Sequence, residues 1–448
     1  MVGGDRRARM EPWDVAVVGG GILGTSVAYW LARRYDGRFA VIEKETDVAQ
    51  HASRRNTGVV HRPFYLDPNK ARVFAHAAGI SYHLWKPYAA AKGLPWYQVG
   101  TYEVALDDGQ VDQLHAYVGY AAENGMDPSE VEFVDGREMA RREPNVRCEG
   151  ALFSKTDTAV DYHAFTEALK ADAEALGVRF LTGASANAVH ANDSGVDITL
   201  NGRKEPVRSR YLIGCAGGSA IDLAHAMGVG TEYTDMHFRG EYWTINTREA
   251  DLARHNVYSV PRHTDLPFLD PHWVIRANGL REIGPNAVPV SGPWSYHGLF
   301  RPLVPWAAKF FEPPIYNKIR LMVDKDFLSL AVQEMWSSMS KAVMLQRVQR
   351  FLPALKLEHL VSPGTAGIRT PVINRHGGIV KEAIEAPGPH SYHILNYNSP
   401  GATGSPAFAV YLVDRLAKRG DLDHLKPGPK PNGLWSWDTI ANAMELTG

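Results

Sequence analysis

Histidines and arginines stand in short motifs where they could together handle a proton and an acid group. His61 lies in RRNTGVVHRPF and His272 follows LPFLDP, and imidazole is the side chain best suited to accept a proton near neutral pH. Arg369, in AGIRTPV, carries a planar guanidinium that can hold a carboxylate through two hydrogen bonds, which the ammonium of lysine cannot do. These side chains predict chemistry on a small carboxylic acid, in which a base takes a proton while an arginine orients the acid group.

Each candidate also has a structural interpretation. The two histidines could instead be polar anchors of the framework, and a surface salt bridge is the alternative for Arg369 because most arginines are solvated. Arg239 is the next candidate for the carboxylate. However, Arg239 and Glu241 fall on one face of a predicted strand and Tyr242 on the other, so not all three side chains can reach one pocket without a bulge.

A glycine turn near the N-terminus predicts a nucleotide site. Gly19, Gly21 and Gly24 have the G-x-G-x-x-G spacing between the apolar run DVAVV and the helical stretch TSVAYWLARR. The first glycine permits the turn, the second lets the backbone approach a pyrophosphate, and the third lets the helix pack on the strand. Glu43 ends the next apolar run, where its carboxylate can accept from both ribose hydroxyls and would repel a 2′-phosphate. The motif therefore favours an unphosphorylated dinucleotide over NADP.

FAD is the predicted cofactor. The thiols of Cys148 and Cys215 are too few for a zinc site or an iron–sulfur cluster, and no metal site is predicted. A second strand–glycine turn lies at 211–218, whereas no further G-x-G-x-x-G unit could hold a separate nicotinamide cofactor. The loop 398–404 precedes a predicted helix and could direct backbone N–H groups at the flavin pyrimidine, with an ordinary helix cap as the alternative.

Composition narrows the class of protein. Lys plus Arg number 48 and Asp plus Glu number 49, so the formal charge of −1 gives no indication of a nucleic-acid partner. The two cysteines fit a reducing compartment. The N-terminal MVGGDRRARMEPWD lacks an apolar run, so we expect neither a secretory signal nor a membrane span, and a cytoplasmic protein. Met10 is an alternative to Met1 as the true start.

The order of the elements favours two domains. The N-terminal strand–turn–helix–strand unit has α/β character, which returns with an amphipathic helix over 163–176 and a strand over 211–215. Residues 236–292 differ, because strand patterns dominate there and an Asn-Gly pair at 278–279 predicts a hairpin. The predicted fold class is therefore α/β, α+β overall, with a second domain built on an antiparallel sheet.

The chain resembles a known family. The segments VAVVGGGILG, VIEKE, RRNTGVVH, FRGEYW, LPFLDPH, GPNA, REPN, AGIRTPV and NYNSPGATGSPA together resemble the L-2-hydroxyglutarate dehydrogenase/oxidase family, a branch of the D-amino-acid-oxidase-like flavoproteins, from about residue 12 to 418. The resemblance implies a discontinuous Rossmann-like FAD-binding domain and an antiparallel-sheet substrate domain. The expected ranges are 11–90, 150–235 and 360–420 for the FAD-binding domain, 91–149 and 236–359 for the substrate domain, and 421–448 for a C-terminal extension.

The motifs and the resemblance also imply a set of site residues. Expected at the substrate are Arg239, Tyr242, Asn286 and Arg369, with His61 and His272 as catalytic groups. Expected at the cofactor are Gly19, Gly21, Gly24, Glu43, Lys44, Ser53, Asn56, Thr57, Gly58, Ala216, Gly217, Gly367, Gly401, Ala402 and Thr403. Related flavoproteins attach FAD covalently through a histidine in a similar loop, which is a further possibility for His61. The chain departs from the family at Arg62, Pro63, Phe64, Tyr65 and Asp270, which leaves the identity of the acid open.

The function that the resemblance implies is oxidation of L-2-hydroxyglutarate or a close 2-hydroxy acid to the 2-oxo acid, with electrons passing to a quinone or dioxygen. A glycine-oxidase-type amine or amino-acid oxidase is the alternative, and a non-enzymatic flavin-binding protein is a third. Residues 294–320 interleave aromatic and basic side chains. They could rest on the inner face of a membrane, where a quinone would be found, or form a cap over the active site.

Overall fold

The first strand lies in the middle of a mostly parallel sheet. The structure is a computed structural model that describes residues 11–262, 270–297, 307, 309–428 and 433–444. β1 (Trp13–Val18) pairs in parallel with β3 (Phe39–Ile42) on one side and with β13 (Val207–Gly214) on the other. The eight-stranded sheet is completed by β10 (Arg179–Leu181), β11 (Ala186–Asn192), β12 (Gly195–Leu200), β22 (Ile384–Gly388) and β23 (Ser391–Asn396).

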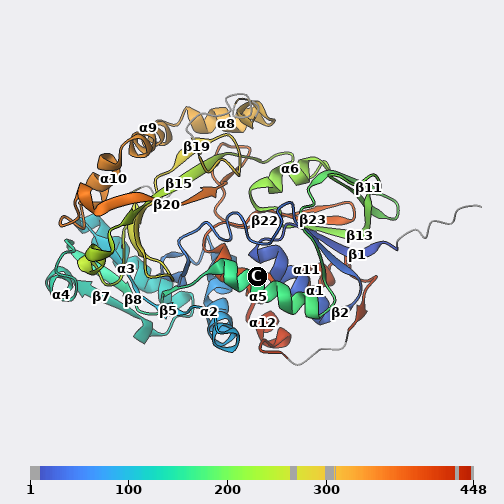
Figure 1. Ribbon diagram of the computed structural model, residues 1–448, viewed down its shortest axis with the longest axis horizontal. Coiled ribbons are helices and arrows are strands. Elements are labelled where there is room, and N and C mark those ends of the chain that lie inside the picture. The colour runs from blue at the N-terminus through green and yellow to red at the C-terminus, as the bar shows by residue number, and fades with distance from the viewer. Residues whose placement is uncertain (1–10, 263–269, 298–306, 308, 429–432, 445–448) are drawn as a thin grey trace, which may run out of the picture.

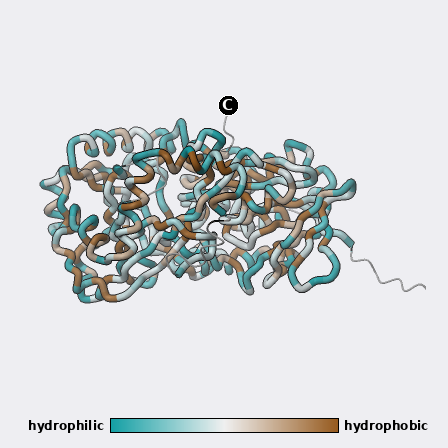
Figure 2. The backbone as a smooth tube through the Cα atoms, turned by 90° about the horizontal axis from the view of Figure 1, so that it is seen from above, coloured by the Kyte–Doolittle hydropathy of each residue, from teal (hydrophilic) through white to brown (hydrophobic). Residues whose placement is uncertain are grey.

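Helices from distant parts of the chain cover this sheet. α1 (Ile22–Arg34) follows the glycine turn and packs against α5 (Tyr162–Ala175) and α11 (Gly401–Lys418), and α11 packs in turn on α2 (Arg72–Lys92). Their apolar faces and one face of the sheet form one core, and the other face of the sheet borders a second, so the four residues Val15 to Val18 of β1 are apolar and buried. Figure 2 shows the hydrophobic segments inside the molecule and hydrophilic segments along its outline.

The segment predicted to be a C-terminal extension, 421–448, is part of this core where it is described. β24 (Lys426–Pro427) pairs with β2 (Tyr35–Asp36), and α12 (Trp437–Met444) packs on α11 and α2. Trp435 is buried, and its Nε1 donates to the carbonyl of Leu84 at 3.0 Å. The range 421–448, expected to be a C-terminal extension, thus packs on the first unit where it is described, and the LWSW segment after a run of glycines and prolines carries no periodic signal that would indicate this burial.

A nine-stranded sheet forms the second unit, beside the first (Figure 1). Its strand order is β19-β15-β18-β17-β16-β6-β8-β7, with β20 also paired to β15. The strands are β6 (Thr101–Ala105), β7 (Val131–Asp135), β8 (Gly150–Ser154), β15 (His237–Ile245), β16 (Asn256–Ser259), β17 (His272–Ile275), β18 (Arg281–Gly284), β19 (Val288–Val290) and β20 (Leu360–Arg369). The pairs are antiparallel except β16 with β6, and β17–β18 is the predicted hairpin. The predicted fold class is confirmed.

Helices flank this second sheet, and short strands link the two units. α3 (Asp108–Glu123) and α4 (Gly136–Arg142) pack on β7 and β8 of the second unit, which also carries α8 (Ile315–Met322), α9 (Lys325–Met339) and α10 (Lys341–Val348). α6 (Ala220–His225) packs on β13 and β23 of the first unit. β14 (Thr234–Asp235) pairs with β21 (Val372–Ile373), and β4 (Val59–Val60) and β5 (Tyr97–Gln98) pair with β9 (Thr158–Ala159). Among the described helices, none combines the length and the apolar content that crossing a membrane requires.

Two strands lie outside the units expected for them. β8 and β20 fall in the ranges 150–235 and 360–420 that were assigned to the FAD-binding domain, but they pair with β6, β7 and β15 of the nine-stranded sheet. The reason is that local patterns indicate a strand without indicating its partner. We therefore propose that the domain boundaries lie after β8 and after β20.

Candidate active site

The three glycines of the N-terminal turn each have a different structural reason. Gly19 has a φ of +113°, which side chains rarely adopt, and a Cβ on Gly24 would overlap the carbonyl oxygen of Gly19. A Cβ on Gly21 would meet only Ser53 Oγ, at 3.0 Å. Gly21 is thus free of steric demands from the protein's backbone and faces the adjoining cavity, as expected of the glycine that a pyrophosphate approaches.

Glu43 completes the turn. Its Oε2 accepts from the Gly20 N–H at 2.7 Å and its Oε1 accepts from the Glu45 N–H at 2.9 Å, which fixes the carboxylate at the end of β3. Burial raises the pKa of Glu43, and the backbone hydrogen bonds from Glu45 and Gly20 act in the opposite direction. The carboxylate lines the cavity and remains able to accept from ribose hydroxyls.

A cavity of about 620 Å³ extends from the glycine turn into the second unit. It is lined by most of the residues predicted to bind the cofactor, namely Gly19, Gly21, Glu43, Lys44, Ser53, Asn56, Thr57, Ala216, Gly217, Gly367, Gly401, Ala402 and Thr403. Gly24 and Gly58 do not line it. Gly24 serves the packing of α1, and Gly58, with a φ of +70°, forms a turn in which its N–H donates to Asn56 Oδ1 at 2.8 Å. Gly24 and Gly58 thus hold the shape of the turn and loop beside the cavity, and a direct contact of either with the cofactor stays a prediction.

The loop 398–404 brings a helix N-terminus to the cavity. α11 begins at Gly401, and no side chain caps it. Ala402 and Thr403 line the cavity from its first turn, where helical N–H groups lack partners within the helix. An ordinary side-chain cap is thus not present here, and the free N–H groups and helix dipole suit an electron-rich or anionic group in the cavity.

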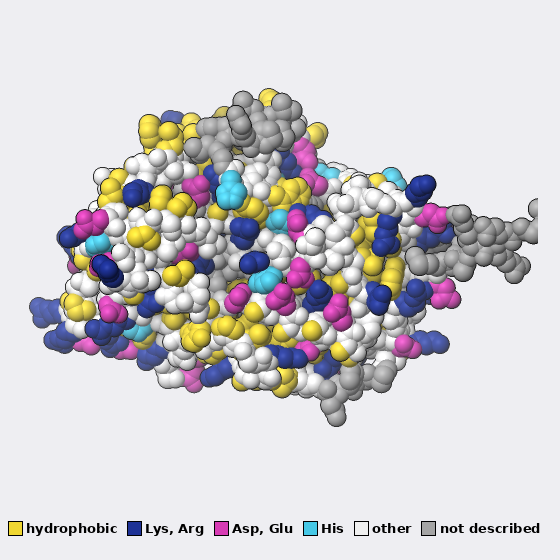
Figure 3. All heavy atoms as spheres, viewed as in Figure 1, with side chains coloured by type: hydrophobic (Ala, Val, Ile, Leu, Met, Phe, Trp, Pro, Cys, Tyr) yellow, Lys and Arg dark blue, Asp and Glu magenta, His cyan; other side chains and the backbone are white. Residues whose placement is uncertain are grey.

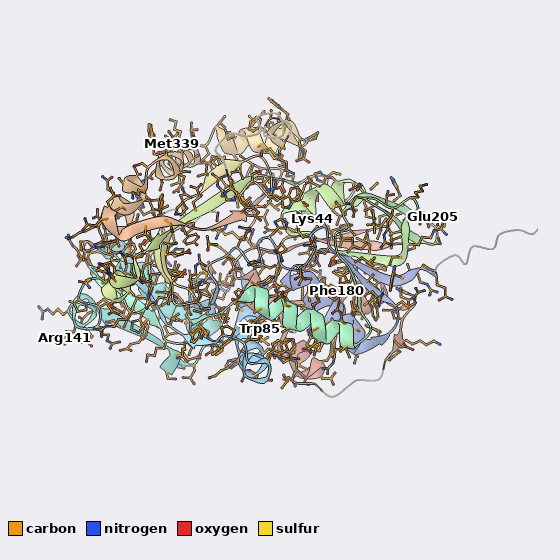
Figure 4. All side chains as sticks on the ribbon, in the orientation of Figure 1. Lys44, Trp85, Arg141, Phe180, Glu205 and Met339 are labelled. Carbon is orange, nitrogen blue, oxygen red and sulfur yellow. The ribbon has the colours of Figure 1, made fainter. Side chains whose placement is uncertain are left out.

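The nucleotide end of the cavity is covered by residues of the second unit. Lys44 Nζ contacts Glu45 Oε1 at 2.6 Å and His51 Nε2 at 2.7 Å, and lies 4.0 Å from the ring centre of Trp294. Tyr296 stacks on His51 and its hydroxyl lies 2.8 Å from His51 Nδ1. Figure 4 places Lys44 at the border of the two units, and Figure 3 shows charged and histidine side chains gathered in the middle of the same face.

Trp294 lines the cavity at the nucleotide end, and the two expectations for 294–320, a cap over the active site and a membrane contact, both stay predictions. Residues 298–306 and 308 of that segment lie outside the described residues. Sequence reasoning did not single out His51, Trp294 or Tyr296, because their contacts join segments far apart in the chain.

The far end of the cavity gathers the predicted chemical groups. His61, Tyr242, His272, Asn286 and Arg369 all line it. His272 is buried in β17, its Nε2 has no hydrogen-bond partner among the described residues, and its ring centre lies 4.0 Å from that of Tyr258. Burial, together with the nearby His61, lowers the pKa of His272 to about 3, so the ring is neutral at physiological pH. A buried polar atom that has no protein partner is typical of a position that binds a ligand.

Arg369 ends β20 directly opposite Phe238 of β15. Loss of water lowers the pKa of Arg369, with the nearby Tyr242 and Tyr65 acting in the opposite direction, but an arginine keeps its charge under such shifts. Burial raises the pKa of Tyr242 to about 12, so its hydroxyl stays protonated and can donate a hydrogen bond. The pair offers a cation and a donor to one bound acid group.

Arg239 is not at the cavity. Along β15, the cavity is lined by Phe238, Gly240 and Tyr242. Because side chains alternate along a strand, Arg239 and Glu241 lie on the opposite face, as the sequence pattern predicted. Arg239 Nη2 forms an ion pair with Glu241 Oε1 at 2.7 Å, and its Nη1 donates to the Ser295 carbonyl at 3.0 Å. Arg239 is not among the residues that line the cavity, so its predicted role at the substrate stays a prediction without support from the described residues.

Asn286 is hydrogen-bonded to Glu241, on the face of β15 that points away from the cavity. It lines the cavity, yet its Oδ1 accepts from the Glu241 N–H and its Nδ2 donates to Glu241 Oε2, both at 2.8 Å. Its side-chain amide is therefore engaged by the protein, and a direct bond to substrate would require one of these contacts to be shared.

Two of the positions that depart from the family motif, Arg62 and Asp270, are engaged in ion pairs. Arg62 is buried, forms an ion pair with Glu130 at 2.7 Å and lies 4.3 Å from the ring centre of Tyr82. Asp270 forms ion pairs with Arg262 at 2.8 Å and Arg347 at 3.2 Å. Neither side chain lines the cavity, so these two departures act on the substrate only through the residues that they contact.

Two residues that sequence reasoning missed stand at the catalytic end. Asp157 lies 3.0 Å from His61 Nδ1 through its Oδ2, and Tyr258 lines the cavity between the two histidines. Asp157 follows a strand in SKTDTAV, where an acidic residue is typical of a turn, so no local signal marked it. Tyr258 occupies an alternating strand pattern, which indicates a facing direction but not a cavity.

Comparison with known proteins decides the family. The model of the FAD dependent oxidoreductase family matches residues 14–415. The chain belongs to this family. FAD is thus the cofactor, and the glycine turn, Glu43 and the N-terminus of α11 are the parts of the chain that fit it.

Curated relatives match nearly the whole chain. The mitochondrial L-2-hydroxyglutarate dehydrogenase of Caenorhabditis elegans is 29% identical over 426 residues, covering 92% of this chain and 95% of the relative. L-2-hydroxyglutarate dehydrogenase of Escherichia coli K12 is 27% identical over 405 residues, covering 90% and 93%, and the human mitochondrial enzyme is 26% identical over 440 residues, covering 94% and 92%.

Solved structures confirm the fold of this oxidoreductase. L-alpha-glycerophosphate oxidase from Mycoplasma pneumoniae with FAD bound has a TM-score of 0.72 at 21% identity, covering 94% of this chain and 97% of that one. Glycine oxidase from Geobacillus kaustophilus has a TM-score of 0.66 at 17% identity, covering 91% and 95%.

Proposed function

We propose that this FAD-dependent oxidoreductase converts L-2-hydroxyglutarate, or a close 2-hydroxy acid, to the 2-oxo acid. The observation that carries the proposal is the union of the FAD cradle with Arg369, Tyr242 and two histidines in one continuous cavity. The names of the curated relatives supply the substrate class. When bound, FAD supplies the acceptor for the hydrogen that leaves the substrate carbon with both of its electrons.

Each group of the chain has a part in this proposal. Arg369 holds the carboxylate next to the reacting carbon through its planar fork, and Tyr242 donates to the same group. A histidine accepts the proton of the substrate hydroxyl. The covering residues Trp294 and Tyr296 hold the nucleotide end and keep water out of the cavity.

We expect the purified yellow protein to lose its visible flavin absorbance when it is mixed anaerobically with L-2-hydroxyglutarate or a close 2-hydroxy acid. The D-enantiomer is the matched control, since an arginine clamp presents only one hydrogen to the flavin. A glycine-oxidase-type amine oxidase would use the same clamp. Bleaching by amino acids with release of ammonia, and none by hydroxy acids, would establish that alternative, and bleaching by no acid or amine would favour a non-enzymatic flavoprotein.

We also propose that electrons pass from the flavin to a quinone or dioxygen, and that the protein works in the cytoplasm with a peripheral contact to the membrane. The support comes from exposed apolar side chains on α8 and α9 and on the chain next to α8, most of which lie beyond the expected range 294–320. These side chains are Phe311, Tyr316, Ile319, Val323, Leu328, Val332, Trp336 and Met339. The last four follow helical spacing along one side of α9, at the outer edge of the molecule where Figure 4 labels Met339.

A bilayer is the proposed occupant because this surface combines apolar side chains with tryptophan and tyrosine and is flanked by Arg320 and Lys325, a composition typical of interfacial helices. We expect the protein to sediment with vesicles containing anionic lipid, and Trp336→Asp to reduce the bound fraction severalfold without loss of flavin. Val118→Asp, at an exposed site on α3, is the matched control. Equal sedimentation of both variants, or association into dimers in place of vesicle binding, would contradict this part of the proposal.

A further inference from the structure

We infer that Asp157 positions His61 and thereby makes His61, rather than His272, the base for the substrate hydroxyl. The inference rests on the proposed oxidation of a hydroxy acid and adds which of the two histidines takes the proton. It follows from the hydrogen bonds that meet at Asp157.

Asp157 is completely buried in the turn between β8 and β9. Its Oδ1 accepts from the backbone N–H of Arg62 at 3.1 Å and from Ser154 Oγ at 2.7 Å. Its Oδ2 accepts from Thr101 Oγ1 at 2.9 Å and lies 3.0 Å from His61 Nδ1. Three donors other than the histidine, from three different segments, therefore hold the carboxylate in one orientation.

This arrangement decides the tautomer of His61. A carboxylate that accepts at both oxygens cannot donate, so the hydrogen of the contact with His61 must belong to Nδ1. The lone pair of the neutral ring then lies on Nε2, whose protein neighbour is Thr57 Oγ1 at the long distance of 3.5 Å. Thr57 and His61 both line the cavity, so Nε2 is the ring atom available to a substrate hydroxyl there.

Proton transfer to His61 creates a charge that Asp157 can balance. The O–H bond of the substrate breaks and its proton goes to Nε2, while the C–H hydrogen leaves with both electrons to the flavin and the C=O bond forms. The ring is then an imidazolium whose Nδ1–H already points at a carboxylate. The proton of the hydroxyl and the positive charge that it creates are therefore both accounted for by His61 and Asp157.

His272 differs from His61 in that aromatic and cationic groups surround its ring. Its ring lies against Tyr258 and Tyr242, and it makes a hydrogen bond with the backbone of Asp270. Arg276 and Arg369 also disfavour a positive charge on it. A proton gained by His272 would have no carboxylate to balance it within the described residues, so we assign to it a neutral, hydrogen-bonding part in holding the substrate.

Other titratable groups face His61 and must be counted in any pH dependence. Within the described part of the chain they are Asp157 before β9, Tyr65 after β4, Tyr258 on β16, His272 on β17 and, behind Asp157, Glu103 on β6. Burial and then the charge of Asp157 raise the pKa of Glu103 to about 8, so Glu103 is uncharged at neutral pH and does not add a second negative charge near His61.

The tautomer can be measured in the resting holoenzyme without any turnover. In protein with ¹⁵N-labelled histidine, we expect the His61 ring, identified by its loss in the spectrum of His61→Gln, to carry its hydrogen on Nδ1 and to leave Nε2 bare. A hydrogen on Nε2 in the wild-type protein would overturn the inference. So would a covalent bond between His61 and the flavin, which acid precipitation would reveal by retaining the yellow colour in the pellet.

The kinetic test uses Asp157→Asn with Asp161→Asn as the matched control. The amide would present an N–H group to Nδ1 and so favour the other tautomer. We expect kcat to fall tenfold or more with little change in KM, since Arg369 is untouched, and the acidic limb of the kcat/KM profile to move to lower pH because the charged ring has lost its partner. Flavin content should be normal. Asp161 is an exposed cap of α5 and its variant should match the wild type.

The outcomes separate this inference from the proposed function. If Asp157→Asn keeps the wild-type kcat, pH profile and tautomer while hydroxy acids still bleach the flavin, Asp157 is structural and the inference falls alone. If no hydroxy acid bleaches the wild type, the proposed function falls and the base assignment with it. Should Asp157→Asn fail to fold, the wild-type tautomer still decides the matter.

Discussion

Replacing Arg369 with lysine is expected to lower kcat/KM by roughly a hundredfold, about 3 kcal/mol of transition-state stabilisation, while the protein keeps its flavin. Lysine retains the charge at the end of β20 but loses the planar fork, so the acid group shifts, and a misplacement of about 1 Å can cost that factor in rate. The measurement is steady-state kinetics with the acid that bleaches the flavin, on protein whose flavin-to-protein ratio equals that of the wild type.

Two further variants make this result decisive. Arg369→Ala removes the cation as well and should lose more activity than Arg369→Lys. Arg239→Lys is the comparison on the opposite face of β15, where the side chain bonds Glu241 and the Ser295 carbonyl and does not meet the cavity, so its KM for the acid should stay close to that of the wild type. Near-normal turnover of both Arg369 variants would mean that another residue holds the carboxylate.

Gly21→Val should give a folded protein that contains no FAD. The position has room within the protein itself, because an added Cβ would meet only Ser53 Oγ at 3.0 Å, a side chain that can move. The branched side chain would instead occupy the cavity where the pyrophosphate approaches the backbone. We expect colourless protein with a cooperative thermal transition and no recovery of flavin when FAD is added.

The neighbouring glycines provide the contrast. Gly24→Ala would place a methyl group on the Gly19 carbonyl oxygen and should prevent folding, not merely flavin binding. Gly119→Val is the control for the substitution itself, since nothing lies within 4 Å of a Cβ there. Normal flavin occupancy in Gly21→Val would show that the pyrophosphate is held elsewhere.

Features that depend on contiguous residues were predictable from the sequence. The glycine turn, Glu43 and the division of β15 into two faces follow from local spacing, since a strand alternates and a turn needs its glycine at a given residue. The function class depended further on a family resemblance, because the spacing of His61, His272 and Arg369 along the chain gives no distance between them.

Features that depend on pairing between distant segments were not predictable. β8 and β20 were recognisable as extended chain, but their place in the second sheet is set by their partner strands. β20, for example, pairs with β15, which lies more than a hundred residues earlier in the chain. Asp157 meets donors from Thr101 and Arg62, and its importance exists only once those segments are together. The burial of Trp435 has the same origin.

The position of Trp435 has a consequence for how the protein is made. Its ring packs against Trp30, Trp85 and Tyr88, which belong to the first helices of the chain, and Trp85 Nε1 donates to the carbonyl of Thr403, a residue that lines the cavity. During synthesis α1 can pack against α5 early, but the aromatic cluster around Trp30, Trp85 and Tyr88 is completed only when the chain beyond residue 435 has left the ribosome. We expect FAD to be acquired only after that point, so that a chaperone has its longest opportunity to bind before the cofactor does.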